Sequence, residues 1–191
     1  MTKAFWSELP ELIDKISDAA EARVIVLSSQ GKHFCAGMDL ANFQDDGEMH
    51  GTNAKKVSQG RRSEAQFRMT RELQYTISCL EKARMPVIAA IQGACIGGAV
   101  DLVTACDIRY AAKDAFFCIQ EINIGMAADV GTLQRLPYLI PEGIVRELAY
   151  TGRRFSADEA LRYGLINAVF DTHETVIDHA LNVAREIADK A

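Results

Sequence analysis

The sequence predicts an α/β protein, because helical and strand patterns alternate along the chain. Apolar side chains recur every three or four positions from Phe5 to Ala20, which predicts an amphipathic helix over about residues 2–20. An apolar run at residues 23–28 ends in a Ser-Ser-Gln-Gly turn, which favours a buried strand. A second run, from Val87 to Ile91, is short and contains β-branched residues, as in a strand buried on both faces.

Four further helices are predicted from an apolar stripe or from capping residues at their ends. Their approximate ranges are 69–82, 141–152, 156–164 and 171–187. Ser156 with Glu159, and Asp171 with Glu174, have the spacing of a capping box. Residues 165–170 are predicted as a short strand or an extended link. Because no repeat, low-complexity run or second domain is found, we expect a single domain over residues 1–191.

Composition excludes several classes of function. Lys and Arg number 21 and Asp and Glu 26, so the formal net charge of −5 provides no basic field for nucleic acid. The five cysteines are scattered among apolar neighbours, and the four histidines lack metal-ligand spacing, so we expect neither a disulfide framework nor a metal site. No apolar run approaches the roughly 20 residues that span a bilayer, so we expect no membrane span.

A glycine-rich turn follows the second strand, at Gly93, Gly97 and Gly98, and precedes a short apolar helix from Ala99 to Cys106. Unpaired N–H groups at a helix N-terminus, together with the helix dipole, favour negative charge. Missing side chains let a ligand approach the backbone closely. The same glycines would also suit tight packing of a helix on a sheet, and the pattern alone leaves both interpretations open.

Three carboxylates flank this candidate anion site. Asp101 lies in the first turn of the short helix, and Glu121 and Asp129 follow in a segment of small residues without helical or alternating periodicity. Ordinary solvated charges do not explain these positions. Asp129 has a structural alternative, because it could cap a helix that begins near Val130.

The central part of the chain resembles the crotonase (enoyl-CoA hydratase/isomerase) superfamily, and within it most resembles the dienoyl-CoA isomerases, which shift a 3,5-diene to a conjugated 2,4-diene. The matching segments are Ile96–Asp101, Ala105–Tyr110, Gln120–Glu121 and Ala127–Pro137. The resemblance implies a crotonase-like (ClpP/crotonase) spiral of ββα units, with layered sheets surrounded by helices. It also implies an acyl-CoA thioester substrate, a role in fatty acid β-oxidation, and assembly as a homotrimer or homohexamer.

The resemblance also implies roles for individual residues. The backbone N–H groups of Met38 and Gly98 would form an oxyanion hole for the thioester oxygen. Asp129 would be the base at C2, Glu121 the acid at the far carbon of the diene, and Asp101 a third carboxylate that tunes or positions the other two. Substrate binding would fall to the backbone of Ala36, Gly37, Met38, Asp39, Leu40 and Gly98.

Other interpretations remain. An enoyl-CoA hydratase uses two glutamates at the positions of Asp101 and Glu121, and an isomerase of single double bonds or a non-catalytic acyl-CoA-binding or oligomer-forming protein would also fit the resemblance. Cys35 with His33 would be a nucleophile–base pair, although no orienting acid is evident. Residues 42–62 are polar and are predicted as a loop or irregular helix near the acyl pocket, or as a solvated linker.

Against the family pattern, we expect this chain to lack N-terminal strands and C-terminal helices. We expect no metal and no cofactor, since coenzyme A is part of the substrate. The final residues spell no Ser-Lys-Leu peroxisomal signal. A cytoplasmic location is expected in a bacterium, and a mitochondrial or peroxisomal one in a eukaryote whose targeting segment has been removed.

Overall fold

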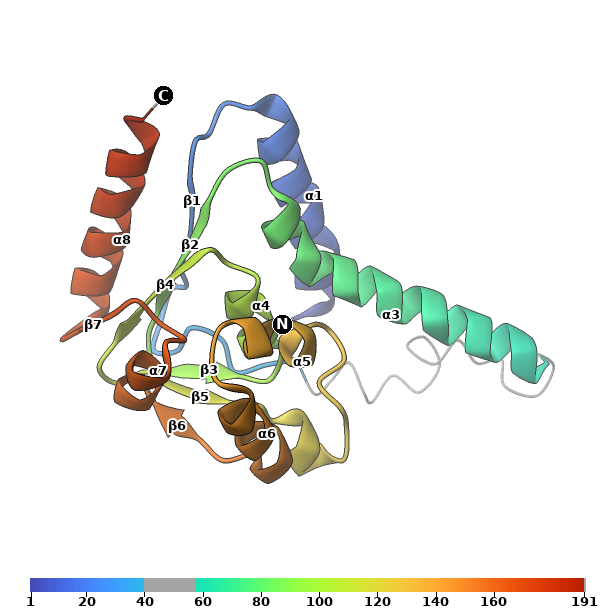
Figure 1. Cartoon of the computed structure of the whole chain (residues 1–191). Helices are drawn as coiled ribbons and strands as arrows, with labels where there is room; N and C mark the ends of the chain where they lie inside the picture. Colours follow the sequence, from blue (N-terminus) through green and yellow to red (C-terminus); the bar gives the residue numbers. More distant parts are fainter. Residues whose placement is uncertain (40–57, 191) are drawn as a thin grey trace.

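Two sheets form the centre of the fold, and helices surround them (Figure 1). The structure is a computed structural model that describes residues 1–39 and 58–190. The larger sheet has the order β1-β2-β4-β7 and is parallel throughout, with strands Ile25–Leu27, Val87–Ile91, Ile108–Ala112 and Ala168–Phe170. The smaller sheet has the order β3-β5-β6, with strands Ala94–Ile96, Phe116–Cys118 and Phe155–Ser156.

The chain passes from the larger sheet to the smaller one and then into a helix, and it does this twice. β2 leads to β3 and helix α4, and β4 leads to β5 and then to short helices η1 and α5. This ββα order confirms the predicted α/β class with layered sheets. The helices are α1 Lys3–Ala19, α3 Gln59–Lys82, α4 Gly98–Thr104, η1 Glu121–Ile124, α5 Thr132–Arg135, η2 Leu136–Tyr138, α6 Glu142–Thr151, α7 Ala157–Tyr163 and α8 His173–Ala188.

The burial of β2 on both faces explains why its sequence is apolar at every position. Val87, Ala89 and Ile91 belong to the main core, which also contains residues of α3 and α4. Ile88 and Ala90 point to the other face, where a second core lies under α8. Because side chains alternate across a strand, a strand covered on both faces must be apolar at every position.

α8 packs across all four strands of the larger sheet (Figure 1). Its N-terminus differs in detail from the prediction. Thr172, rather than Asp171, caps the helix: its hydroxyl accepts from the N–H of Thr175, and its own N–H donates to the Thr175 hydroxyl. The predicted capping box of Asp171 and Glu174 is therefore wrong by one position, whereas the box of Ser156 and Glu159 at α7 is confirmed.

α3 begins at Gln59, ten residues before the predicted helix, so the end of the predicted polar loop is helical. The rest of that loop, residues 42–57, lies outside the described residues. The first half of α3 is exposed and projects from the body of the molecule (Figure 1). An apolar stripe occurs only where a helix packs against the protein. The solvated first half of α3 has no such stripe, so the sequence pattern did not predict it as helical. In the described part of the chain, no helix combines the length and apolar character needed to cross a membrane.

Arg109 on β4 ties α4 to the segment before β7. It is only 6% exposed, and its Nε donates to the carbonyl of Leu165 at 2.6 Å. Its Nη1 donates to the carbonyls of Val103 and Cys106, at the C-terminal end of α4. A cation beside helix-terminal carbonyls is favourable, and here it replaces water for three buried acceptors.

Replacing Arg109 with Met should therefore destabilise the fold, because three buried carbonyls lose a charged donor. We expect the free energy of unfolding, measured by urea denaturation, to fall by about 3 kcal/mol. The matched control is Arg185→Met, which removes an exposed arginine that bonds to Asn182 on α8. Equal, small losses in the two variants would contradict this account of Arg109.

Candidate active site

A cavity of about 410 Å³ opens between α3, the turn before α4 and the loop that follows η1. It brings together six of the predicted site residues: Ala36, Gly37, Met38, Gly98, Glu121 and Asp129. Two others, Asp39 and Asp101, do not line it. Leu40 lies outside the described residues.

The two predicted oxyanion-hole segments run side by side. Cys35 forms a parallel bridge with Cys95, the middle residue of β3, and its N–H and carbonyl both bond to neighbours of that residue. The chain on each side then continues to the cavity, as far as Met38 in one segment and Gly98 in the other. Gly98 is the first residue of α4, so its N–H has no acceptor within the helix.

Met1 packs against both of these segments. Its ammonium group donates to the carbonyl of Gly37 at 2.7 Å, and its carbonyl accepts from the N–H of Asp39 at 3.0 Å. A Cβ at Gly98 would lie 2.9 Å from the Met1 sulfur. The side chain of Met1 therefore lies beside the first residue of α4.

Glu121 begins η1 and lies against the glycine turn. A Cβ at Gly97 would lie 3.1 Å from Oε1 of Glu121, and Gly97 has a positive φ of 57°. The other carboxyl oxygen, Oε2, is buried and has no hydrogen-bond partner among the described residues. Burial raises the pKa of Glu121 to about 7, and the charges of Asp101 and Asp129 add to this rise. Glu121 is thus an acid that holds its proton up to neutral pH.

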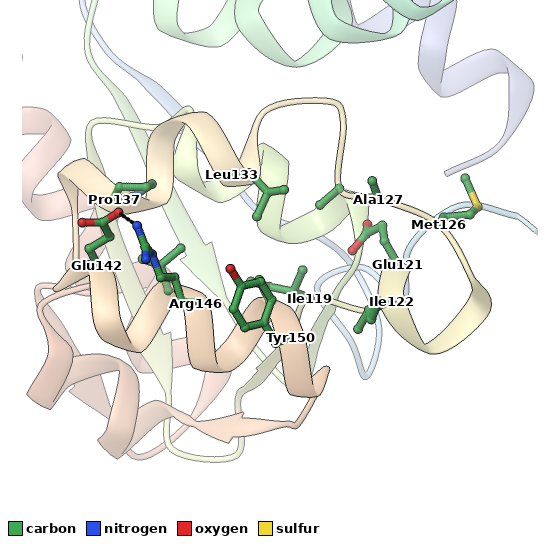
Figure 2. Close-up of a pocket in the computed structure, with 13 residues that line it drawn as sticks. Ile119, Glu121, Ile122, Met126, Ala127, Leu133, Pro137, Glu142, Arg146 and Tyr150 are labelled. Atoms are coloured by element: carbon green, nitrogen blue, oxygen red, sulfur yellow. Dashed lines mark hydrogen bonds and ion pairs between the residues drawn. The ribbon is translucent and has the colours of Figure 1, made fainter.

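Glu121 also borders a second cavity of about 360 Å³ (Figure 2). Met126 and Ala127 are shared between the two cavities. The second cavity is mostly apolar, and the ion pair of Glu142 with Arg146 lies at its far end in the view of Figure 2. Partial burial of Glu121 between the two cavities desolvates its carboxyl group and raises its pKa.

Asp101 is fully buried within α4 and acts inside the protein rather than at the cavity surface. Its Oδ1 accepts from the N–H of Thr132, the first residue of α5, at 2.6 Å. Burial raises the pKa of Asp101, although hydrogen bonding to Thr132 and the charge of Arg135 oppose the rise. The carboxylate therefore links the two helices on either side of the site.

Asp129 is exposed and lines the cavity from the loop before α5. Its carbonyl accepts from Nε2 of Gln74 on α3 at 2.7 Å. The cap of α5 is Gly131, and the N–H of its first residue is bonded by Asp101, so this structure does not use the Asp129 side chain as the helix cap. The carboxylate of Asp129 is thereby left to the cavity.

Sequence reasoning missed the contribution of α3 to the cavity. Gln66, Met69, Thr70 and Leu73 line it, although Met69 and Leu73 had the pattern of an ordinary core stripe. Their spacing of three, one and three residues marks one helical face, but it cannot indicate whether that face meets a cavity or a core. Arg154 also lines the cavity, with its guanidinium 4.8 Å from the centre of the Phe116 ring.

The alternative pair of Cys35 and His33 is not assembled for nucleophilic catalysis. Nδ1 of His33 accepts from the N–H of Ala94 at 3.1 Å, so that nitrogen is not directed at a thiol. Within residues 1–39 and 58–190, no cluster of three or more His, Cys, Asp or Glu side chains could hold a metal ion.

The fold and the cavity define a class of protein in which a helix N-terminus and two carboxyl groups face one ligand site. A family model described as enoyl-CoA hydratase/isomerase matches residues 1–191. A solved enoyl-CoA hydratase from Bacillus anthracis superposes with a TM-score of 0.83 at 33% identity, over 100% of this chain and 68% of that one. The chain therefore belongs to the enoyl-CoA hydratase/isomerase family, which confirms the resemblance seen in the sequence.

Two curated relatives carry a more specific name. The mitochondrial Delta(3,5)-Delta(2,4)-dienoyl-CoA isomerase of Homo sapiens is 47% identical over 193 residues, which cover 100% of this chain and 57% of that protein. The peroxisomal Delta(3,5)-Delta(2,4)-dienoyl-CoA isomerase of Arabidopsis thaliana is 42% identical over 187 residues, which cover 98% of this chain and 66% of that protein. The chain thus spans a little over half of the human relative.

The contact between Gly97 and Glu121 yields a prediction that does not depend on the reaction. In Gly97→Ala, the added methyl group should push the carboxyl from its buried position, so the pKa of Glu121 should fall from about 7 towards 4.5. The pKa is measured by NMR titration of 13C-labelled glutamate.

Gly125→Ala is the matched control, because Gly125 also has a positive φ but a Cβ there meets nothing within 4 Å. Both substitutions should cost about 1–3 kcal/mol of stability through backbone strain. An unchanged Glu121 pKa in Gly97→Ala would show that the glycine does not control the carboxyl.

Proposed function

We propose that this chain carries the site of a dienoyl-CoA isomerase, which converts a 3,5-dienoyl-CoA into the conjugated 2,4-dienoyl-CoA during the breakdown of unsaturated fatty acids. The observation that carries the proposal is the pair of carboxyl groups in one cavity. Glu121 is half-buried, with its Oε2 fully buried and its pKa raised, and Asp129 is exposed. Environments that differ in this way suit one group to donate a proton and the other to accept one.

The thioester oxygen would bind at the N–H groups of Met38 and Gly98. Removal of a C2 proton then produces an enolate, whose negative charge these donors stabilise. One well-placed donor of this kind lowers a barrier by about 2.7–4 kcal/mol. The helix dipole of α4 adds to the effect, because Gly98 is its first residue.

Proton movement completes the isomerisation. Asp129 takes a proton from C2, the electron pair shifts along the diene, and Glu121 gives its proton to C6. The double bonds move from C3 and C5 to C2 and C4, and no atom is gained or lost. Since only protons move, the reaction needs no metal and no redox cofactor, and coenzyme A enters as part of the substrate. Exchange with solvent then restores both carboxyl groups.

The position of Asp101 favours this reaction over hydration. A hydratase of this family would use two glutamates to activate one water molecule, at the positions of Asp101 and Glu121. Here the first is a shorter aspartate, and its carboxylate bonds to Thr132 inside the protein and does not line the cavity. We keep hydratase activity as the second candidate because the Bacillus anthracis relative carries that name.

The names of the relatives support two further parts of the proposal. A mitochondrial or peroxisomal location follows the human and Arabidopsis thaliana names if the chain is eukaryotic. We also propose a homotrimer or homohexamer, the assembly expected from the family resemblance. Exposed apolar side chains support an assembly, because soluble monomers expose few such groups together. On η1 and the α5–α6 region, these are Ile122, Ile124, Leu133, Tyr138 and Tyr150.

Substituting either carboxyl should remove most of the activity. We expect Asp129→Asn and Glu121→Gln each to lower kcat by about 100- to 10,000-fold, because each deletes one proton-transfer group. The measurement follows absorbance of the conjugated thioester from a 3,5-dienoyl-CoA, beside a 2-enoyl-CoA hydration assay. Asp178→Asn, an exposed carboxylate on α8, is the control. Near-normal turnover in both cavity variants would refute the assignment, and hydration without conjugation would favour the second candidate.

Activity should also fall at high pH. A pKa of about 7 means that Glu121 is protonated below this pH and loses its proton above it. Since the protonated form is the proposed donor and this pKa is that of the free protein, kcat/KM should decline tenfold per pH unit well above 7. A pH–rate profile between pH 6 and 9 measures this decline, with substrate stability checked at each pH. A kcat/KM that stays level to pH 9 would exclude Glu121 as the acid.

A further inference from the structure

The segment from Asp129 to Thr132 carries the proposed base, yet it is a short turn between η1 and α5. A base on an exposed turn is effective only if the backbone beneath it is fixed, because a displacement of about 1 Å can cost a factor of about 100 in rate. Side chains from three helices contact the main chain of this segment. Asp101, already described, holds the N–H of Thr132.

Gln74 holds the segment at the base itself. Its Nε2 donates to the carbonyl of Asp129 at 2.7 Å, although the two residues are 55 positions apart in the sequence. Gln74 shares one face of α3 with Ser78 and Glu81, which follow at the helical spacing of four and three residues. This face of α3 thus meets the turn that carries the base.

Arg135 holds the next residue and ties it to the same face of α3. Its Nη1 donates to the carbonyl of Val130 at 3.4 Å, its Nη2 to the hydroxyl of Ser78 at 2.8 Å, and its Nε pairs with Glu81 at 3.1 Å. The Arg135 side chain is 13% exposed, so its contacts with Val130 and Ser78 are partly shielded from water, whereas the Glu81 side chain is 59% exposed. One guanidinium group therefore joins the turn to two residues of α3.

Gly131 makes room for this arrangement. Its φ of 136° is unfavourable for any residue with a side chain, and a Cβ there would overlap the Arg135 guanidinium. The turn is therefore built around the arginine, which occupies the space that a side chain of residue 131 would need.

We propose that Gln74 and Arg135 are positioning residues that clamp the Asp129 turn to α3 and so direct the Asp129 carboxylate at C2 of the substrate. This inference rests on the proposed function. The clamp touches the main chain of the turn and leaves the carboxylate itself free to take the proton. It gives α3, whose neighbouring face lines the cavity, a second role in placing the base.

The test combines Gln74→Met, which keeps the length of the side chain but removes the donor, with a double-mutant cycle. We expect Gln74→Met to lower kcat by about 10- to 100-fold with KM changed by less than about threefold. In the Asp129→Asn background, the same substitution should change kcat by less than about twofold, because the group that it positions is already gone. If Gln74 had only a general structural role, Gln74→Met would lower kcat by the same factor in the unmodified chain and in the Asp129→Asn background.

Arg135→Lys should lower kcat as Gln74→Met does. Lysine keeps the positive charge, but its single ammonium group cannot contact Val130, Ser78 and Glu81 at once as the planar guanidinium does. Two controls separate the clamp from charge effects. Glu81→Gln removes the ion pair but leaves the contacts with Val130 and Ser78. Arg68→Met removes the exposed ion pair with Glu64 on the same helix. Both controls should retain kcat within about threefold.

The outcomes distinguish this inference from the proposed function. If the unmodified chain fails to conjugate a 3,5-dienoyl-CoA, the proposed function fails, and amide hydrogen exchange still tests the clamp. Faster exchange of the peptide over residues 129–132 in Gln74→Met than in Arg68→Met supports the clamp. If the unmodified chain is active, either multiplicative losses in the double mutant or normal kcat in Gln74→Met would overturn the inference.

Discussion

The site depends on the half-buried carboxyl group of Glu121, which lies against the Gly97–Gly98 turn. Glu121 can take its position because Gly97 has no Cβ to meet its Oε1, and Gly97 can adopt its positive φ at low cost because it is glycine. Burial then raises the pKa of Glu121 to about 7. The same turn starts α4 and leaves the N–H of Gly98 without an acceptor in the helix, so one local conformation both raises the pKa of Glu121 and offers the proposed oxyanion donor. Buried oxygen atoms without partners reduce stability, and such costs commonly occur where chemistry is performed.

The surrounding fold holds this turn from several directions. β2 and β3 precede the turn. The parallel backbone pairing of Cys35 with Cys95 places the segment of Met38 beside it, and the Arg109 side chain hydrogen-bonds to carbonyls at the far end of α4. Asp101 joins α4 to α5, so the helix of the proposed oxyanion donor and the helix that follows the proposed base are linked through a single buried carboxylate. The proposed donor, acid and base therefore come from different parts of the chain but are held in one hydrogen-bonded frame.

The sequence allowed a good prediction wherever local physics decides the outcome. β2 was evident because both of its faces are covered, and the capping box at Ser156 was evident because it is made by neighbours in sequence. Glu121, Asp129 and Gly98 were placed by family resemblance, and the structure brings them to one cavity. The contacts of Gln74 with Asp129, and of Arg135 with Ser78, join residues more than fifty positions apart, and no periodicity can reveal such contacts. Asp101 was expected from the resemblance to tune or position the other two carboxylates, but its complete burial and its hydrogen bond to the N–H of Thr132 could not be predicted from the sequence.

The central claim is that a proton leaves C2 to Asp129 and that Glu121 delivers a solvent-derived proton to C6. The most direct test converts a 3,5-dienoyl-CoA in deuterium oxide and locates deuterium in the product by NMR. We predict one deuterium at C6 and a conjugated 2,4-dienoyl thioester, with no oxygen added to the chain. A product without deuterium at C6, or one that carries a new hydroxyl group, would contradict the account.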